Sequence, residues 1–414
     1  MQILYINHYA GSPKLGMEYR PYYLAREWVR AGHAVTIVAA SFAHTRGAQP
    51  EVHGPVTHEV IDGIRYLWIQ TPAYAGNGWR RILNMMAFVR GLYRHLPGFS
   101  AEWRPDAVIA SSTYPLDFYP ARRVARRHQA RLVFELHDLW PLSPMELGHM
   151  SRFHPFIAVM QAGEDAWCRT CDAVVSLLPH ADRHLATRGL APGKFVHVPN
   201  GIDAGEWTGP SAPLPPGHLA FLDQKRAQGR FLVGYAGAHG VANALDALLE
   251  AADHLRGTPI DLVLVGSGPE RERLIAKARE LKLDQVTFLE AIPKGAIPTW
   301  LSQMDCLYLG FKESPLYRFG VSPNKLFDYL MAAKPIVYAA SASNDPVREA
   351  DGGISVPAED AQAIAAGILD LHRTSPEARD AMGQRGRAYI LARHTYPVLA
   401  ARFLQALAPD PGLT

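Results

Sequence analysis

The chain has 414 residues, of which 48% are hydrophobic and 20% are charged. That length allows two domains with separate cores, and three cysteines are too few for a disulfide framework. No stretch is long and apolar enough to cross a bilayer, and the strand-like start lacks the pattern of a signal peptide. We therefore expect a cytoplasmic globular protein with no nucleic-acid partner.

The net charge of +3 is unevenly distributed along the chain. Residues 1–200 carry 21 Lys and Arg against 15 Asp and Glu, a balance of +6, which leaves 21 against 24, or −3, for the remainder. A basic first half favours an anionic partner there, such as a phospholipid surface or a diphosphate-linked substrate. A basic surface that is only solvated is the alternative.

The first half alternates short apolar runs with amphipathic stretches, which predicts strands and helices in turn. The predicted strands span residues 2–8, 34–40, 107–112, 132–137, 173–178 and 195–199, and the predicted helices span residues 21–31, 120–129 and 181–190. Residues 56–70 are interrupted at Asp62 and Gly63, which is typical of an inserted β-hairpin. The alternation predicts a parallel sheet covered by helices on both faces.

A proline-rich segment at residues 209–217 interrupts this alternation, which then starts afresh. The second half has predicted strands at residues 231–236, 261–266, 286–290, 305–310 and 335–339, and predicted helices at residues 242–255, 269–281, 297–304, 322–333 and 361–372. We therefore predict an α/β protein with two Rossmann-like domains, residues 1–204 and residues 205–394. The amphipathic C-terminal segment, residues 395–414, is expected to join the first domain.

The segment Ser322-Pro323-Asn324-Lys325 predicts a helix start that carries a cation. Ser322 is the expected N-cap and Pro323 the first helical residue, so open backbone N–H groups and the positive end of the helix dipole coincide there. A lysine in that first turn is unfavourable by roughly 0.3–1 kcal/mol unless an anion neutralises it. Asp328 lies one turn further on, so a nucleotide whose phosphates meet Lys325 and whose ribose meets Asp328 would fit. A surface Lys–Asp pair is the alternative.

Ligands of parallel sheets bind beyond the carboxyl ends of the strands, and the unusual residues of this chain follow such ends. These turns are residues 10–20, His137-Asp138, residues 199–203, residues 237–240 and residues 266–270. Glycines in such turns let backbone amides approach a phosphate closely, although glycine also serves turn geometry alone.

Three motifs carry a resemblance to a known family. Residues 198–203 (VPNGID), 265–270 (VGSGPE) and 322–329 (SPNKLFDY), in this order, resemble the retaining glycosyltransferases of group 1, the GT4 family. The resemblance spans nearly the whole chain. It implies the GT-B fold, with a nucleotide-sugar donor on the C-terminal domain and the acceptor mainly on the N-terminal one.

The resemblance, together with the turns, gives a candidate site. Asp328 stands where the family usually has a glutamate for the ribose hydroxyls, and His137 stands at the family's histidine beside the donor sugar. We expect His137 and Lys325 to be catalytic, and Lys14, Glu18 and Arg20 to face the acceptor. The expected donor-binding residues are Gly16, Gly237, His239, Gly240, Arg318, Val321, Ser322, Pro323, Asn324, Lys325 and Asp328.

The chain departs from the family pattern in three places. Gly320 stands where many members carry the first of two glutamates, and Met17 replaces the second glycine of the loop that begins at Gly16. Tyr235 and Asn243 occupy the positions nearest to an arginine and a lysine that typically follow the first strand of the donor domain. The diphosphate must then meet the amides of residues 237–240, with His239, Arg318 or Lys325. The spelling SPNKLFDY is most like transferases of bacterial O-antigen and capsule synthesis, including those that use UDP-N-acetyl-fucosamine-type sugars.

A retaining transferase of this kind needs neither a metal cluster nor a paired-carboxylate site, and we expect no cofactor beyond the nucleotide-sugar. Cys168 and Cys171 form a CxxC without a second pair, so we expect buried thiols rather than a zinc site. The acceptor is expected to be a lipid-linked or soluble glycan, with a polyprenyl diphosphate favoured.

Residues 79–95 interleave apolar and aromatic side chains with Arg80, Arg81, Arg90 and Arg94. A basic helix with an aromatic edge suits an anionic membrane surface, which would make the protein peripheral to the cytoplasmic membrane. A core helix with solvated arginines is the alternative.

Three other functions compete with glycosyl transfer. A sugar-nucleotide epimerase shares the two-domain shape but needs no acceptor, and a non-catalytic module could bind nucleotide-sugar or lipid-linked glycan. A dinucleotide-dependent dehydrogenase is disfavoured because no strand leads into a complete GxGxxG.

Overall fold

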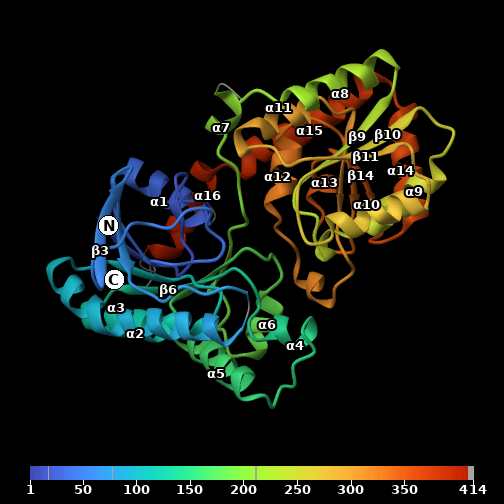
Figure 1. Ribbon diagram of the computed structural model, residues 1–414. Coiled ribbons are helices and arrows are strands. Elements are labelled where there is room, and N and C mark those ends of the chain that lie inside the picture. The colour runs from blue at the N-terminus through green and yellow to red at the C-terminus, as the bar shows by residue number, and fades with distance from the viewer. Residues whose placement is uncertain (17, 77, 210–211, 409–414) are drawn as a thin grey trace. The chain divides into compact units, whose positions relative to one another are not determined.

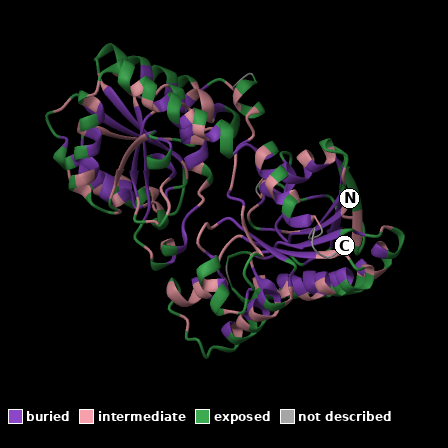
Figure 2. Cartoon of the chain, turned by 180° about the vertical axis from the view of Figure 1, so that it is seen from behind, coloured by how far each residue is buried: buried purple, intermediate pink, exposed green. Residues whose placement is uncertain are grey.

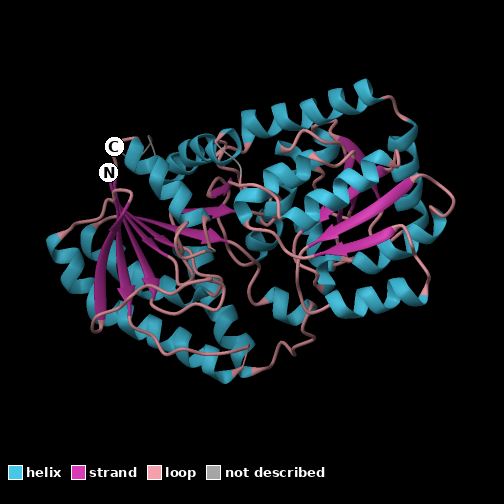
Figure 3. Cartoon of the chain, turned by 45° about the horizontal axis from the view of Figure 1, so that its top comes forward, coloured by secondary structure: helices cyan, strands magenta, loops and turns pink. Residues whose placement is uncertain are grey.

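Two separate sheets organise the chain in the computed structural model, which describes residues 1–16, 18–76, 78–209 and 212–408 (Figure 1). One unit comprises residues 1–199 together with the chain from residue 396 onward, and the other comprises residues 200–395. Helices flank the strands in both units (Figure 3). The predicted α/β class is confirmed.

The first sheet has the strand order β3-β4-β2-β1-β5-β6-β7-β8, and every pairing except β3 with β4 is parallel. Its strands are β1 (Gln2–Ile6), β2 (Ala34–Ala40), β3 (Val56–Ile61), β4 (Ile64–Ile69), β5 (Ala107–Ala110), β6 (Arg131–Leu136), β7 (Ala173–Ser176) and β8 (Phe195–His197). Asp62 and Gly63 join β3 to β4 with φ values of 50° and 81°. The predicted hairpin is thus confirmed, with the left-handed two-residue turn that antiparallel strands favour.

Two pairs of helices cover this sheet. Helices α1 (Arg20–Arg30) and α16 (Tyr396–Leu407) lie on one face, and α2 (Trp79–Glu102) and α3 (Phe118–His128) lie on the other (Figure 1). The ring of Trp28 on α1 lies 5.2 Å from that of Phe403, and Tyr23 stacks on Tyr396 at 4.6 Å. These contacts fix the C-terminal helix in the first unit, although residues 409–414 of the predicted segment lie outside the described part of the chain.

The rest of the first unit includes a long helix that was not predicted from the sequence. Helix α5 (Pro155–Thr170) starts with proline and packs Trp167 flat on Phe134 of β6, with ring centroids 4.2 Å apart. Two short helices accompany it, α4 (Leu142–Glu146) and α6 (Asp182–Thr187).

The second sheet is parallel throughout and has the order β11-β10-β9-β12-β13-β14. Its strands are β9 (Phe231–Ala236), β10 (Ile260–Val265), β11 (Val286–Leu289), β12 (Cys306–Gly310), β13 (Ile336–Ala339) and β14 (Gly353–Val356). The sequence missed β14, which is short and begins with glycine. A side chain at Gly353 would approach the carbonyl oxygen of Ile336 to 2.0 Å, so the pairing of β14 with β13 requires that glycine.

The central strand β9 shows how the second core is divided. Val233 and Tyr235 pack on the side of α9 (Leu245–His254) and α14 (Ala361–Arg373), whereas Leu232 and Ala236 pack on the side of α11 (Ile297–Ser302) and α12 (Asn324–Met331), as expected for the two-residue period of a strand. The strands of the unit are buried between these layers (Figure 2). The helices are α7 (Gly205–Thr208), α8 (Pro216–Ala227), α9 (Leu245–His254), α10 (Arg271–Glu280), α11 (Ile297–Ser302), α12 (Asn324–Met331), α13 (Pro346–Glu349), α14 (Ala361–Arg373) and α15 (Pro376–Arg393).

The chain passes from the first unit to the second after Pro199, five residues before the predicted boundary. The amide of Ile202 donates to the carbonyl of His394 at 2.9 Å, so the segment that follows Pro199 is already bound to the second unit. Residues 210–211 of the proline-rich segment lie outside the described residues. Among the described helices, none combines the length and the apolar character needed to span a bilayer.

Candidate active site

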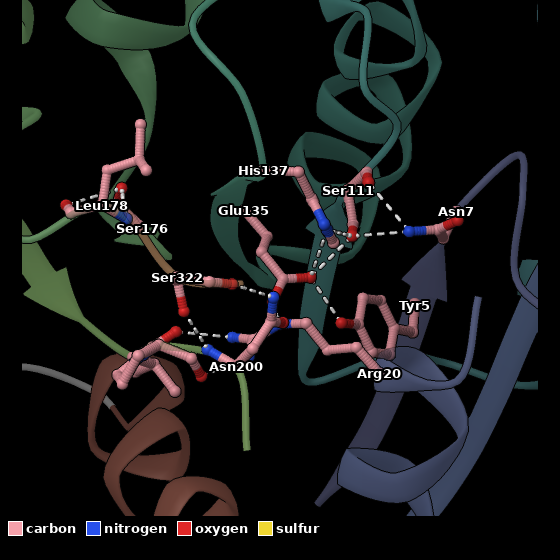
Figure 4. Close-up of polar contacts among 12 residues, drawn as sticks. Tyr5, Asn7, Arg20, Ser111, Glu135, His137, Ser176, Leu178, Asn200 and Ser322 are labelled. Atoms are coloured by element: carbon pink, nitrogen blue, oxygen red, sulfur yellow. Dashed lines mark hydrogen bonds and ion pairs between the residues drawn. The ribbon is translucent and has the colours of Figure 1, made fainter. Parts of the chain in front are cut away.

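Helix α12 begins one residue later than the sequence predicts. Its first residue is Asn324, and Pro323 is the N-cap in an extended conformation, with φ −78° and ψ 131°. Ser322 does not cap the helix. Its hydroxyl oxygen accepts the backbone N–H of Asn200 at 2.8 Å, and its carbonyl accepts the side-chain amide of Asn200 at 2.8 Å (Figure 4).

A second asparagine holds the neighbouring residue. Asn344 accepts the backbone N–H of Val321 at 2.8 Å and donates its side-chain amide to the Val321 carbonyl at 2.9 Å. The segment before α12 is therefore fixed from both sides. The amides of Asn324 and Lys325, which open the helix, have no preceding helical carbonyl to bind, and such amides form an anion site.

Lys325 extends from this helix start toward the end of β9. Its ammonium nitrogen donates to the Tyr235 hydroxyl at 2.9 Å and to the side-chain carbonyl of Asn243, and it lies 4.8 Å from the centre of the Tyr235 ring. Burial lowers the pKa of Lys325 to about 8. None of the groups described around this ammonium is a carboxylate, so its charge has no protein counter-ion there.

The glycine turns after β9 and β10 interlock beside Lys325. Gly237 and Gly266 have φ values of 153° and 150°, and a side chain at Gly266 would lie 1.9 Å from the Gly237 carbonyl oxygen. A side chain at Gly237 would lie 2.6 Å from the Lys325 side chain. Here glycine is required for close approach, and the same bare backbone lets Lys325 cross the turn.

His239 lies inside this interlocked pair of turns. Its side chain is fully buried, and neither ring nitrogen has a hydrogen-bond partner among the described residues. Burial lowers the pKa of His239 to about 4, with further lowering by Arg271 and Lys325. The imidazole is therefore neutral at pH 7 and supplies no cation for a phosphate. The following residue, Gly240, precedes the short 3-10 turn Val241–Asn243.

Asp328 has surroundings different from those of Lys325. Burial raises the pKa of this partly buried carboxyl to about 7, and Glu206 raises it further, against the opposing effects of Lys294 and Trp207. Arg318 is exposed, lies 4.4 Å over the Phe319 ring and donates to the Pro315 carbonyl.

A buried carboxylate joins the ends of three strands in the first unit (Figure 4). Glu135 on β6 is fully buried and accepts hydrogen bonds from Tyr5 on β1, Arg20 at 2.8 Å, Ser111 after β5 at 2.6 Å and His137 at 3.3 Å. Burial by itself would raise the pKa of Glu135, but Arg20, His137 and Ser111 outweigh it and hold the pKa well below its ordinary value.

The hydrogen bonds of this network assign the protons of His137. The Ser111 hydroxyl donates to Glu135 and accepts the side-chain amide of Asn7 at 2.9 Å, so it can only accept from Nε2 of His137, which lies 2.9 Å away. Nε2 therefore carries the hydrogen. Within the described residues Nδ1 has no partner, and 14% of the side chain is exposed. His137 can thus accept a hydroxyl hydrogen at Nδ1.

Arg20 does not face an acceptor, contrary to the expectation from sequence. It is 3% exposed, pairs with Glu135 and donates to the carbonyls of Val198 and Pro199 at 2.8 and 2.6 Å. These contacts use all three guanidinium nitrogens and join α1 to β6 and to the segment that ends at Pro199.

The loop before α1 places the remaining acceptor-side residues. Lys14 is exposed and Glu18 is partly buried, while a side chain at Gly16 would lie 2.9 Å from the Gly47 amide. Gly16, with φ 89°, is thus needed for the packing of this loop against residues 46–48. Met17 lies outside the described residues.

Sequence reasoning missed Glu135, Asn200 and Asn344. Glu135 could have been found, because a charge inside the apolar run 132–136 must be paired when the strand is buried. Asn200 belongs to the VPNGID motif, but nothing in that motif names Ser322 as its partner.

The two cysteines of the CxxC motif are buried. Cys168 and Cys171 are buried free thiols, and burial raises the pKa of both. Over the described ranges, no three His, Cys, Asp or Glu side chains are grouped as ligands for a metal ion.

Two family models match most of the chain. Residues 16–201 match the glycosyl transferase 4-like domain, and residues 230–374 match the glycosyl transferases group 1. A putative colanic acid biosynthesis glycosyl transferase, WcaI of Escherichia coli (strain K12), is 23% identical over 359 residues, which cover 83% of this chain and 85% of WcaI.

Solved structures resemble the whole chain. Sucrose-phosphate synthase from Thermosynechococcus elongatus has a TM-score of 0.70 at 17% identity, over 98% of this chain and 97% of the synthase. Anabaena HepE in complex with UDP and glucose has a TM-score of 0.65 at 14% identity, over 98% of this chain and 99% of HepE. At these identities the likeness shows the fold, which is GT-B.

Proposed function

Since this chain belongs to the group 1 glycosyltransferases, we propose that it moves a sugar from a nucleoside-diphosphate sugar to a glycan acceptor with retention of configuration. The observation that carries the donor part is Lys325, a partly buried ammonium at an open helix start with only neutral described partners. A diphosphate would supply the missing counter-charge.

The mechanism follows from charge stabilisation. As the bond between the sugar and the diphosphate breaks, negative charge grows on the leaving phosphate, where Lys325 and the amides that open α12 are positioned to receive it. The sugar gains oxocarbenium character, and the acceptor hydroxyl attacks from the face that the diphosphate leaves, with a phosphate oxygen as the proton acceptor. Nδ1 of His137 would accept a hydrogen bond from a sugar hydroxyl, and the carboxylate of Asp328 would accept hydrogen bonds from the ribose hydroxyls. We assign no nucleophile and no metal ion.

We propose UDP as the nucleotide and an N-acetylated deoxyhexosamine as the sugar. The SPNKLFDY spelling supports the sugar class, and the UDP complex of HepE supports the nucleotide. We further propose a polyprenyl-diphosphate-linked glycan as the acceptor, in the synthesis of a bacterial surface polysaccharide. The name of WcaI, a relative in colanic acid biosynthesis, supports this setting.

Helix α2 supports contact with the inner face of the cytoplasmic membrane. Its first turns expose four apolar residues, Trp79 (66%), Ile82 (44%), Leu83 (50%) and Met86 (50%). Arg80, Arg90 and Arg94 are also exposed on this helix, so apolar and cationic side chains are presented together, which suits an anionic lipid surface.

Product analysis tests the proposal. A thermal-shift panel of UDP, GDP, ADP and TDP selects the nucleotide, and we expect UDP to give the largest shift. The purified chain is then incubated with a labelled UDP-sugar and a polyprenyl-diphosphate sugar. Label in the lipid-linked product supports transfer. Release of a free epimer, or binding with neither product, would contradict it in favour of an epimerase or a binding module.

A further inference from the structure

Tyr235 and Asn243 occupy the positions nearest to the arginine and the lysine that the family resemblance implies. The structure brings both of them to one atom, the ammonium nitrogen of Lys325. These two uncharged residues therefore hold the ammonium of Lys325 in place.

The hydrogen bonds fix the orientation of both side chains. The side-chain amide of Asn243 donates to the Ala238 carbonyl at 2.9 Å, so its oxygen faces Lys325. The Tyr235 hydroxyl donates to the same carbonyl at 2.6 Å, so it accepts from Lys325. An ammonium has three hydrogens, and this arrangement uses two of them. The third is left for a ligand.

The backbone supports this geometry. Asn243 ends the 3-10 turn Val241–Asn243, and Ala244 after it is left-handed, with φ 45° and ψ 41°. Tyr235 is fully buried in β9. Lys325 therefore lies between a rigid strand and a tight turn, so its long side chain loses little further freedom when a ligand binds.

We propose that Tyr235 and Asn243 are positioning residues that form a neutral cradle for Lys325, so that one fixed ammonium replaces the usual arginine–lysine pair in binding the donor diphosphate. The inference rests on the proposed function. Because the cradle contains no carboxylate, the charge of Lys325 is not neutralised by the protein and is available to the phosphate.

The pH dependence of nucleotide binding follows from the same geometry. The titratable groups that face Lys325 are Tyr235 from β9 and His239 from the turn after it. The pKa of Tyr235 is raised by burial and that of His239 is lowered to about 4, so neither changes charge between pH 6 and 9. Lys325, with its pKa lowered to about 8 by burial, is mostly neutral at pH 9. UDP binding at pH 9 should therefore take up most of a proton.

The test compares UDP with uridine by calorimetry in two variants of the cradle. Asn243→Asp places a carboxylate beside Lys325, so UDP affinity should fall about tenfold or more while uridine affinity stays within about twofold. Proton uptake at pH 9 should also disappear, because the added carboxylate keeps Lys325 charged. Tyr235→Phe should weaken UDP several-fold, again without an effect on uridine.

Each variant has a matched control. Gln224→Glu adds the same charge on the exposed side of α8, and Tyr308→Phe removes a buried hydroxyl that has no described partner on the neighbouring strand β12. Both should bind UDP like the wild type. Cradle variants that match their controls, or that weaken UDP and uridine equally, overturn the inference. A wild-type chain that binds none of the four nucleoside diphosphates would overturn the proposed function together with it.

Discussion

Burial shifts the pKa values of two residues on α12 in opposite directions. Burial lowers the pKa of Lys325 to about 8 and raises that of Asp328 to about 7. In both cases the charged form is disfavoured, because the site lacks an opposite charge close enough to offset desolvation. Both values lie near neutral pH, so the charges of Lys325 and Asp328 change over the range from about pH 6 to pH 9.

Replacement of Asp328 should make the protein less sensitive to alkaline pH. The pKa of Asp328 is raised in the folded state, so its contribution to stability is present at low pH and is lost as the pH rises through about 7. Asp328→Asn has no such loss. The variant should therefore gain stability relative to the wild type between pH 5 and pH 8, as measured by urea unfolding at both values.

The control for this prediction is a carboxyl with the opposite shift. Asp246 has its pKa lowered to about 2, chiefly by its hydrogen bond with Arg273, so its contribution is present above pH 4 and is lost only as the pH falls toward 2. The effect of Asp246→Asn should therefore be the same at pH 5 and pH 8. An equal effect of Asp328→Asn at the two values would show that Asp328 is ionised throughout.

At the scale of elements, Glu135 joins segments that are distant in sequence. Tyr5 on β1, Ser111 after β5 and Arg20 at the start of α1 all donate to this carboxylate of β6. Arg20 also binds the carbonyls of Val198 and Pro199. One buried charge pair thus fixes the carboxyl-end edge of the first sheet, where His137 lies.

Glu135→Gln should destabilise the first unit by roughly 3–5 kcal/mol, because Arg20 would keep its charge in a buried site without a counter-ion. Denaturant unfolding followed by circular dichroism measures this loss. The control Glu59→Gln changes an exposed carboxylate that accepts the Trp68 indole N–H, and it should cost less than about 1 kcal/mol. Equal losses of unfolding free energy in the two variants would show that the buried pair of Arg20 and Glu135 stabilises the unit no more than an exposed carboxylate does.

Helix α2 has one buried face and one exposed face. Asn84, Met85, Phe88 and Leu92 are buried against the sheet, whereas Trp79, Ile82, Leu83 and Met86 are exposed. The two interpretations of residues 79–95 are therefore not exclusive, since one face is core and the other is free for a surface. Arg81 belongs to neither group, because it is partly buried and donates to the Tyr9 hydroxyl at 3.2 Å.

Reversal of two exposed arginines on α2 should reduce binding to anionic vesicles. Arg90→Glu with Arg94→Glu replaces attraction by repulsion, and screening limits this effect to about 8 Å at physiological ionic strength. Sedimentation with phosphatidylglycerol vesicles should fall for the variant and, for the wild type, should fall with added salt.

The matched control reverses two exposed arginines of the second unit, Arg373→Glu with Arg393→Glu, and should sediment like the wild type. UDP binding should be unchanged in both variants. Vesicle binding that changes neither with salt nor with the substitutions at Arg90 and Arg94 would point to a soluble acceptor. The exposed face of α2 would then be only solvated.

For the molecule as a whole, each unit has its own core, and the chain passes between them at two points. The second passage brings Tyr396, Leu399 and Phe403 into the core of the first unit. The indole N–H of Trp28 donates to the Ala400 carbonyl at 3.1 Å, and Arg131 donates to the Ala406 carbonyl at 2.7 Å. The last helix is therefore an integral layer of the first unit.

Phe403→Ala should lower the free energy of unfolding of the first unit by about 3–5 kcal/mol, because it leaves a cavity beside Trp28. UDP should still raise the free energy of unfolding of the second unit, by about 2.7 kcal/mol at a UDP concentration a hundred times its Kd. Calorimetric scans with and without UDP separate the two transitions.

The control Phe153→Ala removes a ring that is 77% exposed, and the free energy of unfolding of each unit should stay within about 0.5 kcal/mol of the wild type. A Phe403→Ala variant in which both transitions fall together would mean that the two units unfold as one. The prediction thus also tests the division of the chain at Pro199 and Thr395.

Periodicity was sufficient to predict most strands and helices, because buried parallel strands and amphipathic helices have strong local patterns. It failed at β14 and at helices that include α5, α8 and α15. Strand β14 is held by close backbone approach at Gly353, which depends on its partner strand. The buried stripe of α5 has helical spacing but includes Gly163 and Glu164, which weaken its apolar pattern.

The sequence by itself determined the two-domain α/β class, the β3–β4 hairpin and the helix start that carries Lys325, because each depends on residues close together in the chain. Only the tertiary structure decided the partners of the charges. Arg20 forms a buried ion pair with Glu135 instead of facing the acceptor. Ser322 binds Asn200 instead of capping the helix. Tyr235 and Asn243 accept hydrogen bonds from Lys325. The reason is physical: a buried charge or amide must find a partner wherever the fold offers one, and the sequence does not show which strand ends will be neighbours.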